Sequence, residues 1–351
     1  MSLVAVSAAE VVADAGRFDA VIDVRSPAEF AEDHLPGAVN WPVLDDEQRH
    51  IVGSLYKQVS PLQARKVGAA MVARNIADHV DRWLADQPRE WQPLVYCWRG
   101  GQRSGSLAWF LGQIGFRSAQ LQGGYKAFRA LVRTELQSLP ANFEYRVLCG
   151  RTGSGKTRLL QALAEQGAQA LDLEGLAGHR GSLLGAVPGI EQPSQKRFDT
   201  LCWQALKAFD PARPVFVESE SRRIGALRVP EALIAQFREQ GHCLRIELDP
   251  AARLRLLLQD YGHFVDDAEA FCRQLDGLVE LRGRDTVKGW QAQARAGHWA
   301  EVFDALMEQH YDPLYERSLR SSFRQLPQAE LLPLPDAEAA TLQDAARRLA
   351  A

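Results

Sequence analysis

Cysteine is scarce in this chain, with five residues among 351. None of them is spaced as a C-x-x-C pair, and their odd number argues against a framework of disulfide bonds. Few and scattered cysteines are typical of proteins whose thiols stay reduced. We therefore expect a cytoplasmic protein.

Long apolar segments are also missing. The first residues, MSLVAVSAAEVVADAG, contain no positively charged stretch and no cleavage pattern, and no later segment is apolar for long enough to cross a membrane. We expect neither a signal peptide nor a membrane partner. The formal net charge is only −3, so an RNA-binding site would have to be a local basic patch.

Two domains are predicted, because 351 residues exceed one typical hydrophobic core. Apolar runs at 18–26 and 93–97 predict buried strands, and the apolar spacing of 104–116 predicts a helix. Alternation of strands and helices indicates a parallel-sheet α/β domain over 1–137.

A short segment, 138–144, carries a proline and an asparagine between two periodic regions and is the predicted linker. The alternation then restarts, with a strand at 145–149 and a helix at 156–167. This order predicts a second, doubly wound α/β domain of the P-loop NTPase type over 145–351, with a helical tail from about residue 251.

The stretch VYCWRGGQRSGS (95–106) places Cys97 between a predicted strand and a helix that begins at Ser104. Such a turn directs backbone N–H groups and the positive end of the helix at the sulfur, which favours a nucleophilic thiolate. Glycines permit the required backbone angles, and arginines can bind an oxyanion. The predicted anion loop consists of Trp98, Arg99, Gly100, Gly101, Gln102 and Arg103, with Cys97, Arg99 and Arg103 as the catalytic candidates.

A core cysteine in an ordinary strand-to-helix turn is the alternative interpretation, because free cysteine is usually buried. The glycines, the arginines and the position of Cys97 between strand and helix favour the reactive thiol. With the loop, the segments DVRSPAEFAEDHLPGAVN (23–40) and LQGGYKAF (121–128) give this domain a resemblance to the rhodanese sulfurtransferases. The loop is one residue longer than the usual sulfurtransferase loop, a length that also occurs in phosphatases of this fold. It therefore suggests a bulkier anion than a persulfide.

A second anion-binding motif, GRTGSGKT, fits G-x-x-x-x-G-K-[ST] in full and lies between a predicted strand and a predicted helix. Its N–H groups would wrap linked phosphates, Lys156 would reach the outer phosphate, and Thr157 is placed to contact Mg²⁺. A coincidental glycine-rich turn is the alternative. The predicted phosphate-binding residues are Gly150, Arg151, Thr152, Gly153, Ser154, Gly155, Lys156 and Thr157.

The phosphate compound is less defined than the motif. None of the three asparagines belongs to an N-K-x-D guanine reader, which disfavours a GTPase. PVFVESES (214–221) ends in Glu218 and Glu220 where a Walker B strand usually carries aspartate, so Glu218 is a candidate to bind a metal or position water. A solvated acidic loop is the alternative. Cys149, beside the phosphate loop, is predicted to belong to the core.

Basic, glycine-containing loops at 175–185, 220–230 and 278–291 suit a phosphodiester backbone and an unstacked base. A solvated charged face is the alternative, because most runs of charge bind nothing. The two tyrosines of HYDPLYERS (310–318) are predicted to pack in the core. The candidates for a second site are Glu218, Glu220, Arg222, His179 and Arg180.

The order of the motifs carries a wider resemblance. A rhodanese-like domain ahead of a P-loop domain, with EGLAGHRGS, VESESRRIG and YDPLYERS in this order, resembles the tRNA 2-selenouridine synthases over about residues 1–320. The resemblance implies conversion of 2-thiouridine to 2-selenouridine at the wobble position of certain tRNAs, with selenophosphate as selenium donor. It also implies an S-geranylated intermediate made from geranyl diphosphate.

By this resemblance the P-loop would hold the diphosphate of the prenyl donor, and Lys156 would stabilise charge on the leaving group. Cys97 would be the nucleophile or the selenium carrier, with Arg99 and Arg103 binding the oxygens of selenophosphate. An apolar groove for the prenyl chain is expected near the P-loop. No tightly bound cofactor is implied beyond an optional Mg²⁺, and the implied partners are tRNA and a supplier of selenophosphate.

Three other functions stay open at this level. One is ATP-dependent tRNA thiolation with a persulfide on Cys97. Another is a nucleotide-regulated RNA-binding protein with an inactive rhodanese domain. The third is a phosphatase, suggested by the length of the loop, although no clear general acid accompanies the loop in the sequence.

Overall fold

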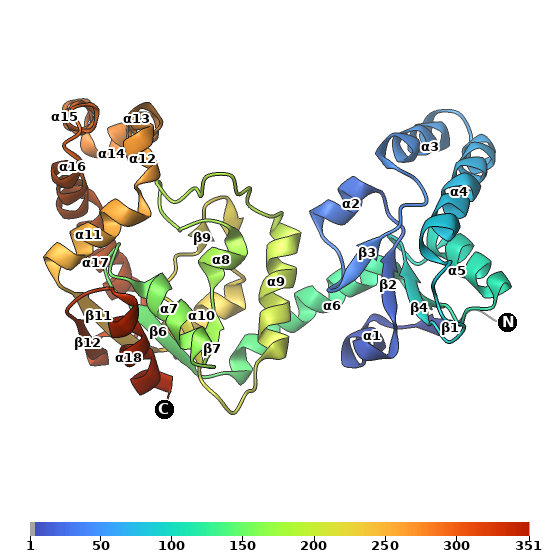
Figure 1. The fold of residues 1–351 in the computed structure, drawn as a ribbon, viewed down its shortest axis with the longest axis horizontal. Coiled ribbons are helices and arrows are strands. Elements are labelled where there is room, and N and C mark those ends of the chain that lie inside the picture. Colours follow the sequence, from blue (N-terminus) through green and yellow to red (C-terminus); the bar gives the residue numbers. More distant parts are fainter. Residues whose placement is uncertain (1–3, 351) are drawn as a thin grey trace. The chain divides into compact units, whose positions relative to one another are not determined.

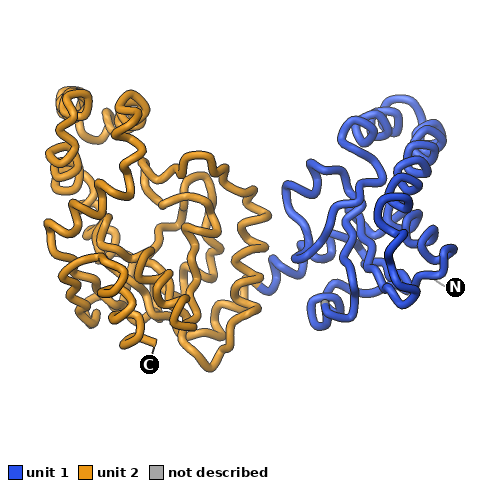
Figure 2. The backbone as a smooth tube through the Cα atoms, viewed as in Figure 1, with its two compact units in different colours: residues 1–135 blue, residues 136–351 orange. Residues whose placement is uncertain are grey.

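The computed structural model describes residues 4–350, which form two compact units divided after Glu135 (Figure 2). The division falls within the last turns of helix α6 (Gly124–Ser138). The segment 138–144 continues from this helix through a 3₁₀ turn at Leu139–Asn142 into the first strand of the second unit. Each unit is built on its own parallel sheet, which confirms the predicted α/β class.

The sheet of the first unit has five parallel strands in the order β1-β5-β4-β2-β3. Its central strand, β4, is buried along its whole length. Because both faces of a parallel sheet are covered, such a strand has a continuous apolar sequence rather than an alternating one. The strands are β1 (Val4–Val6), β2 (Ala20–Asp23), β3 (Ala38–Asn40), β4 (Pro93–Tyr96) and β5 (Ala119–Leu121).

Helices cover both faces of this sheet (Figure 1). Ile76 of α4 and Leu107 of α5 join Val95 of β4 in one buried cluster, while α1 and α6 lie on the opposite side. α4 begins after Ser60, whose Oγ accepts the N–H of Gln63 and satisfies one of the unpaired amides of the first turn. The helices are α1 (Ala8–Ala13), α2 (Pro27–Glu32), α3 (Asp46–Gln58), α4 (Pro61–Trp83), α5 (Gln102–Ile114) and α6 (Gly124–Ser138).

A buried ion pair fixes the carboxyl end of β2. Arg25 is fully buried, and its Nη2 lies 2.6 Å from Asp23 Oδ2 and 2.6 Å from the carbonyl oxygen of Asp33. Its guanidinium also lies over the ring of Tyr125, 4.1 Å from the centroid. A buried charge is tolerated only when it is paired. The pair therefore ties β2, the segment after α2 and the start of α6 together.

The sheet of the second unit has five parallel strands in the order β12-β11-β6-β8-β7. Because β6 is central, the loop that follows it opens at the carboxyl edge of the sheet between β8 and β11. An antiparallel ribbon, β9–β10, follows β8. The strands are β6 (Tyr145–Cys149), β7 (Gln169–Leu171), β8 (Val215–Glu218), β9 (Arg223–Ile224), β10 (Leu227–Arg228), β11 (His242–Leu248) and β12 (Glu330–Leu334).

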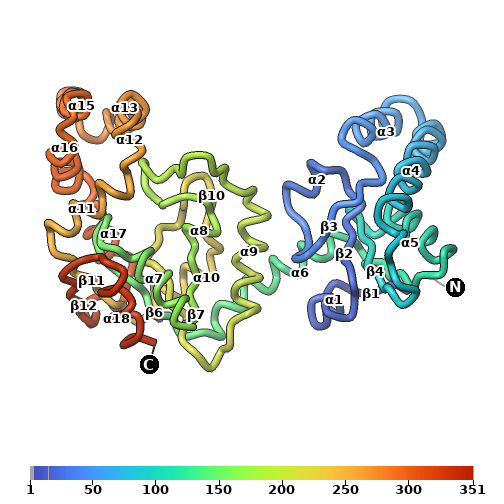
Figure 3. The backbone as a smooth tube through the Cα atoms, viewed as in Figure 1, coloured from blue at the N-terminus to red at the C-terminus, as the bar shows by residue number. Residues whose placement is uncertain are grey.

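Helices α7 and α18 pack side by side on this sheet although they are far apart in the sequence (Figure 3). Helices α11 to α16 pack around Phe271, Trp290 and Phe303, as predicted for the region after about residue 251. The predicted tail is not wholly helical, because β12 pairs with β11 at the edge of the sheet. The helices are α7 (Lys156–Glu165), α8 (Leu173–Ala177), α9 (Gln195–Ala208), α10 (Glu231–Glu239), α11 (Pro250–Asp260), α12 (His263–Asp266), α13 (Ala268–Leu275), α14 (Val279–Arg282), α15 (Arg284–Arg295), α16 (Trp299–Leu306), α17 (Asp312–Ser322) and α18 (Ala339–Ala350).

All five cysteines are buried free thiols. Cys149 lies in β6 with no exposed surface, in the core position predicted for it. Within residues 4–350, no helix combines the length and the hydrophobicity that a membrane crossing requires.

Candidate active sites

The Cys97 loop follows β4 and leads into α5. Two hydrogen bonds reach the sulfur: the backbone N–H of Gly101 lies 3.3 Å from Cys97 Sγ, and Ser104 Oγ lies 3.2 Å from it. Both donors belong to the start of α5, so the positive end of the helix faces the sulfur. The thiol is buried, with 4% of the residue exposed.

The shape of this loop depends on the start of α6. The N–H groups of Tyr125 and Lys126 donate to the carbonyl oxygens of Cys97 and Trp98, at 2.8 and 2.9 Å. A Cβ on Gly124, which has φ +58°, would overlap the Cys97 carbonyl oxygen. The loop carbonyls are therefore turned toward α6, which leaves the amide of Gly101 free to face the sulfur.

These contacts change the acidity of the thiol. Burial alone would raise the pKa of Cys97, but the hydrogen bonds from Ser104 and Gly101 and the positive charge of Arg103 lower it below its ordinary value. A lowered thiol pKa increases the fraction of thiolate at neutral pH. The geometry supports a nucleophilic cysteine rather than an inert core residue.

The other predicted members of the loop have different surroundings. Trp98 is half-buried against Tyr125, with ring centroids 5.4 Å apart, whereas Arg99 and Gln102 are exposed. Gly100 has φ +64°, a conformation that side chains rarely adopt. Of these residues, only Arg99 has a charged side chain exposed beside the thiol.

Arg103 departs from its expected role as an oxyanion donor. Its Nη1 lies 2.7 Å and its Nη2 3.3 Å from the two carboxylate oxygens of Glu29 in α2. Burial would raise the pKa of Glu29, but Arg103 lowers it. Two of the guanidinium nitrogens are therefore committed to Glu29, and Arg103 acts on Cys97 as a fixed positive charge. Sequence analysis missed Glu29, although it lies in the rhodanese-like segment 23–40.

The P-loop connects β6 to α7. Gly153 and Gly155 have φ +75° and +81°, and a Cβ on Gly153 would lie 2.6 Å from the side chain of Leu257. Lys156 Nζ donates to the carbonyl oxygens of Gly150 (2.9 Å) and Arg151 (3.2 Å). These carbonyl oxygens are thus paired within the loop. The N–H groups of Gly150 and Ser154 donate to the Tyr315 hydroxyl and to the Arg151 carbonyl oxygen, so the other amides of the loop are the candidates to bind phosphate.

An acidic wall faces the P-loop. Glu218 ends β8, which pairs directly with β6, and it is 4% exposed with an Oε1 that has no hydrogen-bond partner. Glu220 lies two residues further on and is 8% exposed. Glu174 of α8, which sequence analysis missed, has its Oε2 3.5 Å from Thr157 Oγ1. The buried glutamates exclude the solvated acidic loop as an interpretation.

Burial and mutual repulsion keep this wall partly protonated. Burial, with the neighbouring Glu218 and Glu220, raises the pKa of Glu174 to about 9. Burial also raises the pKa of Glu218 to about 7, although Lys156 opposes this shift, and it raises the pKa of Glu220. The charge of the pocket therefore changes near neutral pH.

The pocket between the P-loop and the acidic wall has a volume of about 470 Å³. It contains Glu218, Glu220 and Arg180 from the predicted second site, and Arg180 Nη1 donates to the carbonyl oxygen of Asp260 at 2.6 Å. His179 and Arg222 are not part of its lining. His179 Nδ1 instead lies 3.1 Å from the N–H of Gly181 within a turn, and Arg222 is exposed, so the structure splits the predicted second site.

Tyr315 is a pocket residue rather than a simple core residue. Its hydroxyl is hydrogen-bonded to Ser219 Oγ and accepts the N–H of Gly150 at 3.3 Å, and Lys156 Nζ lies 5.1 Å from the centre of its ring. Tyr311 also lines the pocket. It ends a π-helical turn at Met307–Tyr311, a distortion common at functional sites. The spacing of the two tyrosines in the sequence did not distinguish pocket residues from core residues.

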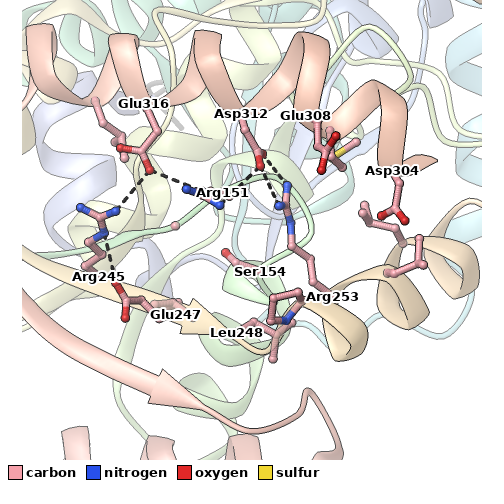
Figure 4. Close-up of a pocket in the computed structure, with 17 residues that line it drawn as sticks. Arg151, Ser154, Arg245, Glu247, Leu248, Arg253, Asp304, Glu308, Asp312 and Glu316 are labelled. Atoms are coloured by element: carbon pink, nitrogen blue, oxygen red, sulfur yellow. Dashed lines mark hydrogen bonds and ion pairs between the residues drawn. The ribbon is translucent and has the colours of Figure 1, made fainter. Parts of the chain in front are cut away.

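On its other side, the P-loop is held by ion pairs to α17 (Figure 4). Arg253 donates to both carboxylate oxygens of Asp312 and, through Nε, to the carbonyl oxygen of Thr152 at 2.8 Å. Arg151 lies 3.6 Å from Asp312 and 3.5 Å from Glu316. Arg151 therefore points toward α17. The Thr152 carbonyl is held by Arg253, which is itself paired with Asp312 of α17, so α17 stabilises the conformation of the loop.

The two units match two family descriptions. Residues 7–131 match the rhodanese-like domain, and residues 143–284 match the tRNA 2-selenouridine synthase AAA domain. The tRNA 2-selenouridine synthase of Alcanivorax borkumensis is 34% identical over 331 residues, which cover 85% of this chain and 89% of that protein. The chain belongs to the tRNA 2-selenouridine synthase family.

Other members of the tRNA 2-selenouridine synthase family are similarly related. The protein of Hydrogenovibrio crunogenus is 32% identical over 327 residues, covering 86% of this chain and 89% of that protein. The protein of Chromohalobacter salexigens is 38% identical over 242 residues, which cover 69% of this chain and 64% of that protein. These relationships confirm the predicted family and the predicted order of a rhodanese-like domain followed by a P-loop domain.

Replacing Ser104 with alanine removes one hydrogen bond to the Cys97 sulfur and should raise the pKa of that thiol. The pH at which alkylation of Cys97 by iodoacetamide is half-maximal should move upward, and the rate at neutral pH should fall several-fold. Peptide mass spectrometry identifies the alkylated cysteine. Ser106→Ala is the matched control, because Ser106 Oγ bonds to the carbonyl of Gln102 instead of the sulfur. Identical profiles for both variants would contradict activation by the loop.

Pyrophosphate binding without divalent cations should weaken as pH rises, because Glu218 becomes negatively charged above its pKa of about 7. Between about pH 6 and about pH 8 the dissociation constant should rise on the order of tenfold more in the wild type than in Glu218→Gln. Isothermal titration calorimetry in EDTA measures it. Pyrophosphate itself also titrates in this range, but it does so equally for both proteins, so the difference between wild type and variant reports on Glu218. Parallel pH profiles would show that Glu218 does not face the ligand.

Proposed function

We propose that this chain converts wobble 2-thiouridine of certain tRNAs into 2-selenouridine in two steps: S-geranylation from geranyl diphosphate, then replacement of the geranylated sulfur by selenium. Relatives that align with most of the chain carry the name tRNA 2-selenouridine synthase, which supports the overall reaction. The observation that supports the division into two steps is that the chain has two differently built loops, one around a thiol that accepts two hydrogen bonds and one with the P-loop lysine.

In the first step, the sulfur of 2-thiouridine attacks C1 of geranyl diphosphate. The C–S bond forms as the C–O bond breaks, diphosphate leaves with the electron pair, and the base loses its ring N–H proton to solvent. Charge builds on the leaving oxygen, where Lys156 and the P-loop amides would stabilise it. Two N–H groups of the Lys156 ammonium donate to loop carbonyls, and the third would donate to a diphosphate oxygen.

A divalent cation fits the same pocket. Thr157 Oγ1 and the unpartnered, buried Oε1 of Glu218 are oxygen ligands of the kind that Mg²⁺ prefers. Across residues 4–350, no group of three or more His, Cys, Asp or Glu side chains is arranged to hold a metal, so the cation would share its ligands with the diphosphate. When bound, it would neutralise part of the leaving-group charge.

In the second step, selenophosphate would bind in the Cys97 loop through its phosphoryl oxygens. The Cys97 thiolate attacks phosphorus, the S–P bond forms as the P–Se bond breaks, and selenide leaves with the electron pair. Selenide adds to C2 of the S-geranylated base and expels geranylthiolate. The ring nitrogen takes back from solvent the proton that it lost in the first step, and geranylthiolate takes up another. Water then hydrolyses the S–P bond to restore the thiol and release phosphate.

This route makes Cys97 a nucleophile rather than a selenium carrier. Phosphorus and selenium keep their oxidation states in every step, whereas a perselenide on Cys97 would require an oxidant. A tetrahedral phosphoryl group also agrees with a loop one residue longer than that of the usual sulfurtransferases. The hydroxyl of Ser104, 3.2 Å from the sulfur, is placed to stabilise the departing thiolate during hydrolysis.

The macromolecular partner in this proposal is a tRNA that carries wobble 2-thiouridine. Exposed Arg99 beside the thiol and exposed Arg222 after the acidic wall could contact its phosphates. A protein that supplies selenophosphate and a reducing cytoplasm complete the proposal, because Cys97 must remain a thiol between turnovers.

Two variants separate the proposed steps. With a stem–loop RNA that contains 2-thiouridine, geranyl diphosphate and selenophosphate, the wild type should form 2-selenouridine without ATP. Lys156→Ala should slow S-geranyl formation on the order of a hundredfold or more. Cys97→Ser should accumulate the S-geranyl nucleoside and form no 2-selenouridine. Nucleoside mass spectrometry measures both products.

Lys66→Ala, which replaces an exposed lysine of α4 outside both loops and outside the predicted RNA-binding segments, is the matched control and should behave as the wild type. A strict requirement for ATP hydrolysis would instead support a thiolation enzyme. If Cys97→Ser still formed 2-selenouridine, the rhodanese-like loop would not take part in the reaction, as expected for an inactive domain.

A further inference from the structure

A large apolar groove lies on the first unit, on the side formed by α3, α4 and α5. Its volume is about 980 Å³. One wall comes from Val52 and Tyr56 of α3, and the other from Trp109 and Phe110 of α5. The floor comes from α4. It is mostly apolar, with one charged residue, Arg65, and its apolar members are Ala64, Gly68, Ala69, Val72, Ala73 and Ile76.

The floor is apolar because of its helical spacing. Ala69, Val72, Ala73 and Ile76 are spaced by three and four residues, so they share one face of α4. Their small size leaves the groove open. Gly68 lets α3 pack closely against α4, since a Cβ there would lie 3.3 Å from a methyl group of Val52.

The aromatic walls are exposed to an unusual degree. Trp109 is 61% exposed, Tyr56 is 56% exposed and Phe110 is 39% exposed. The core beneath them is already closed by Leu107 and Leu111 of the same helix. Contiguous apolar surface of this kind on a folded unit usually marks a binding site.

The first turn of α5, which follows directly on the Cys97 loop, lines part of the groove. Gln102 and Arg103 belong to the loop and line the groove, as do Gly105 and Ser106 in the next positions of α5. The same first turn of α5 carries Ser104, which is hydrogen-bonded to the sulfur. An apolar ligand in the groove would therefore end close to the anion-binding loop.

We infer that this groove binds the prenyl chain of the S-geranylated wobble nucleoside while the Cys97 loop releases selenium. The inference rests on the proposed function and adds a prenyl site in the rhodanese-like unit to the one expected near the P-loop. The bond that breaks in the second step joins the base to a sulfur that carries an isoprenoid chain. A groove of matching chemistry beside the loop would hold this leaving group and orient C2 toward the selenide.

Two RNA stem–loops test the groove, one with S-geranyl-2-thiouridine and one with S-methyl-2-thiouridine, both supplied with selenophosphate. Trp109→Ser removes a wall, and Ala69→Trp fills the floor. In both variants KM for the geranyl RNA should rise on the order of tenfold to a hundredfold, because apolar contact with the chain is lost. The reaction of the methyl RNA and S-geranyl formation from geranyl diphosphate should stay unchanged.

Ile114→Ser is the matched control, because Ile114 is 48% exposed on the same helix and lies outside the groove lining. Unchanged KM in both groove variants would overturn the inference. A change in the sedimentation of Trp109→Ser without a change in KM would also overturn it, because this result would mean that a second copy of the chain occupies the groove. Failure of the wild type to convert the geranyl RNA would instead overturn the proposed function.

Discussion

Both anion sites depend on one constraint: the carbonyl oxygens of a loop must be bonded elsewhere before its N–H groups can face an anion. After β4, the N–H groups at the start of α6 take the carbonyls of Cys97 and Trp98, and this approach is possible only because Gly124 has no side chain. After β6, Lys156 takes the carbonyls of Gly150 and Arg151, and Arg253 takes that of Thr152. Two unrelated loops thereby become candidate anion sites at the carboxyl edges of their sheets.

The groups placed at the centre of each loop give the two sites different chemistry. The first loop surrounds a thiol whose pKa is lowered by hydrogen bonds from Ser104 and Gly101 despite its burial, so it favours attack on an electrophile. The second loop places an ammonium group opposite buried glutamates, of which Glu218 titrates near neutral pH. An anionic ligand there depends on protons or a cation, which suits transient binding of a diphosphate leaving group.

Local sequence was sufficient to predict the fold class, the two loops and the position of Glu218, because each depends on neighbours in the chain. Strand-to-helix turns and the G-x-x-x-x-G-K-[ST] spacing are local patterns. The sequence could not place the residues that reach these loops from distant segments. Glu29 neutralises Arg103 from α2, and Tyr315 reaches Gly150 from α17. Such contacts depend on tertiary packing, as does the separation of His179 and Arg222 from the other second-site candidates.

The central claim is that the P-loop acts on the RNA base before the Cys97 loop and is not needed afterwards. The most direct measurement is the rate at which Lys156→Ala forms 2-selenouridine from a stem–loop RNA that already carries S-geranyl-2-thiouridine. If the two loops act one after the other, this rate should be close to that of the wild type, even though the same variant forms little product from 2-thiouridine. Loss of selenium incorporation from the preformed intermediate would contradict it.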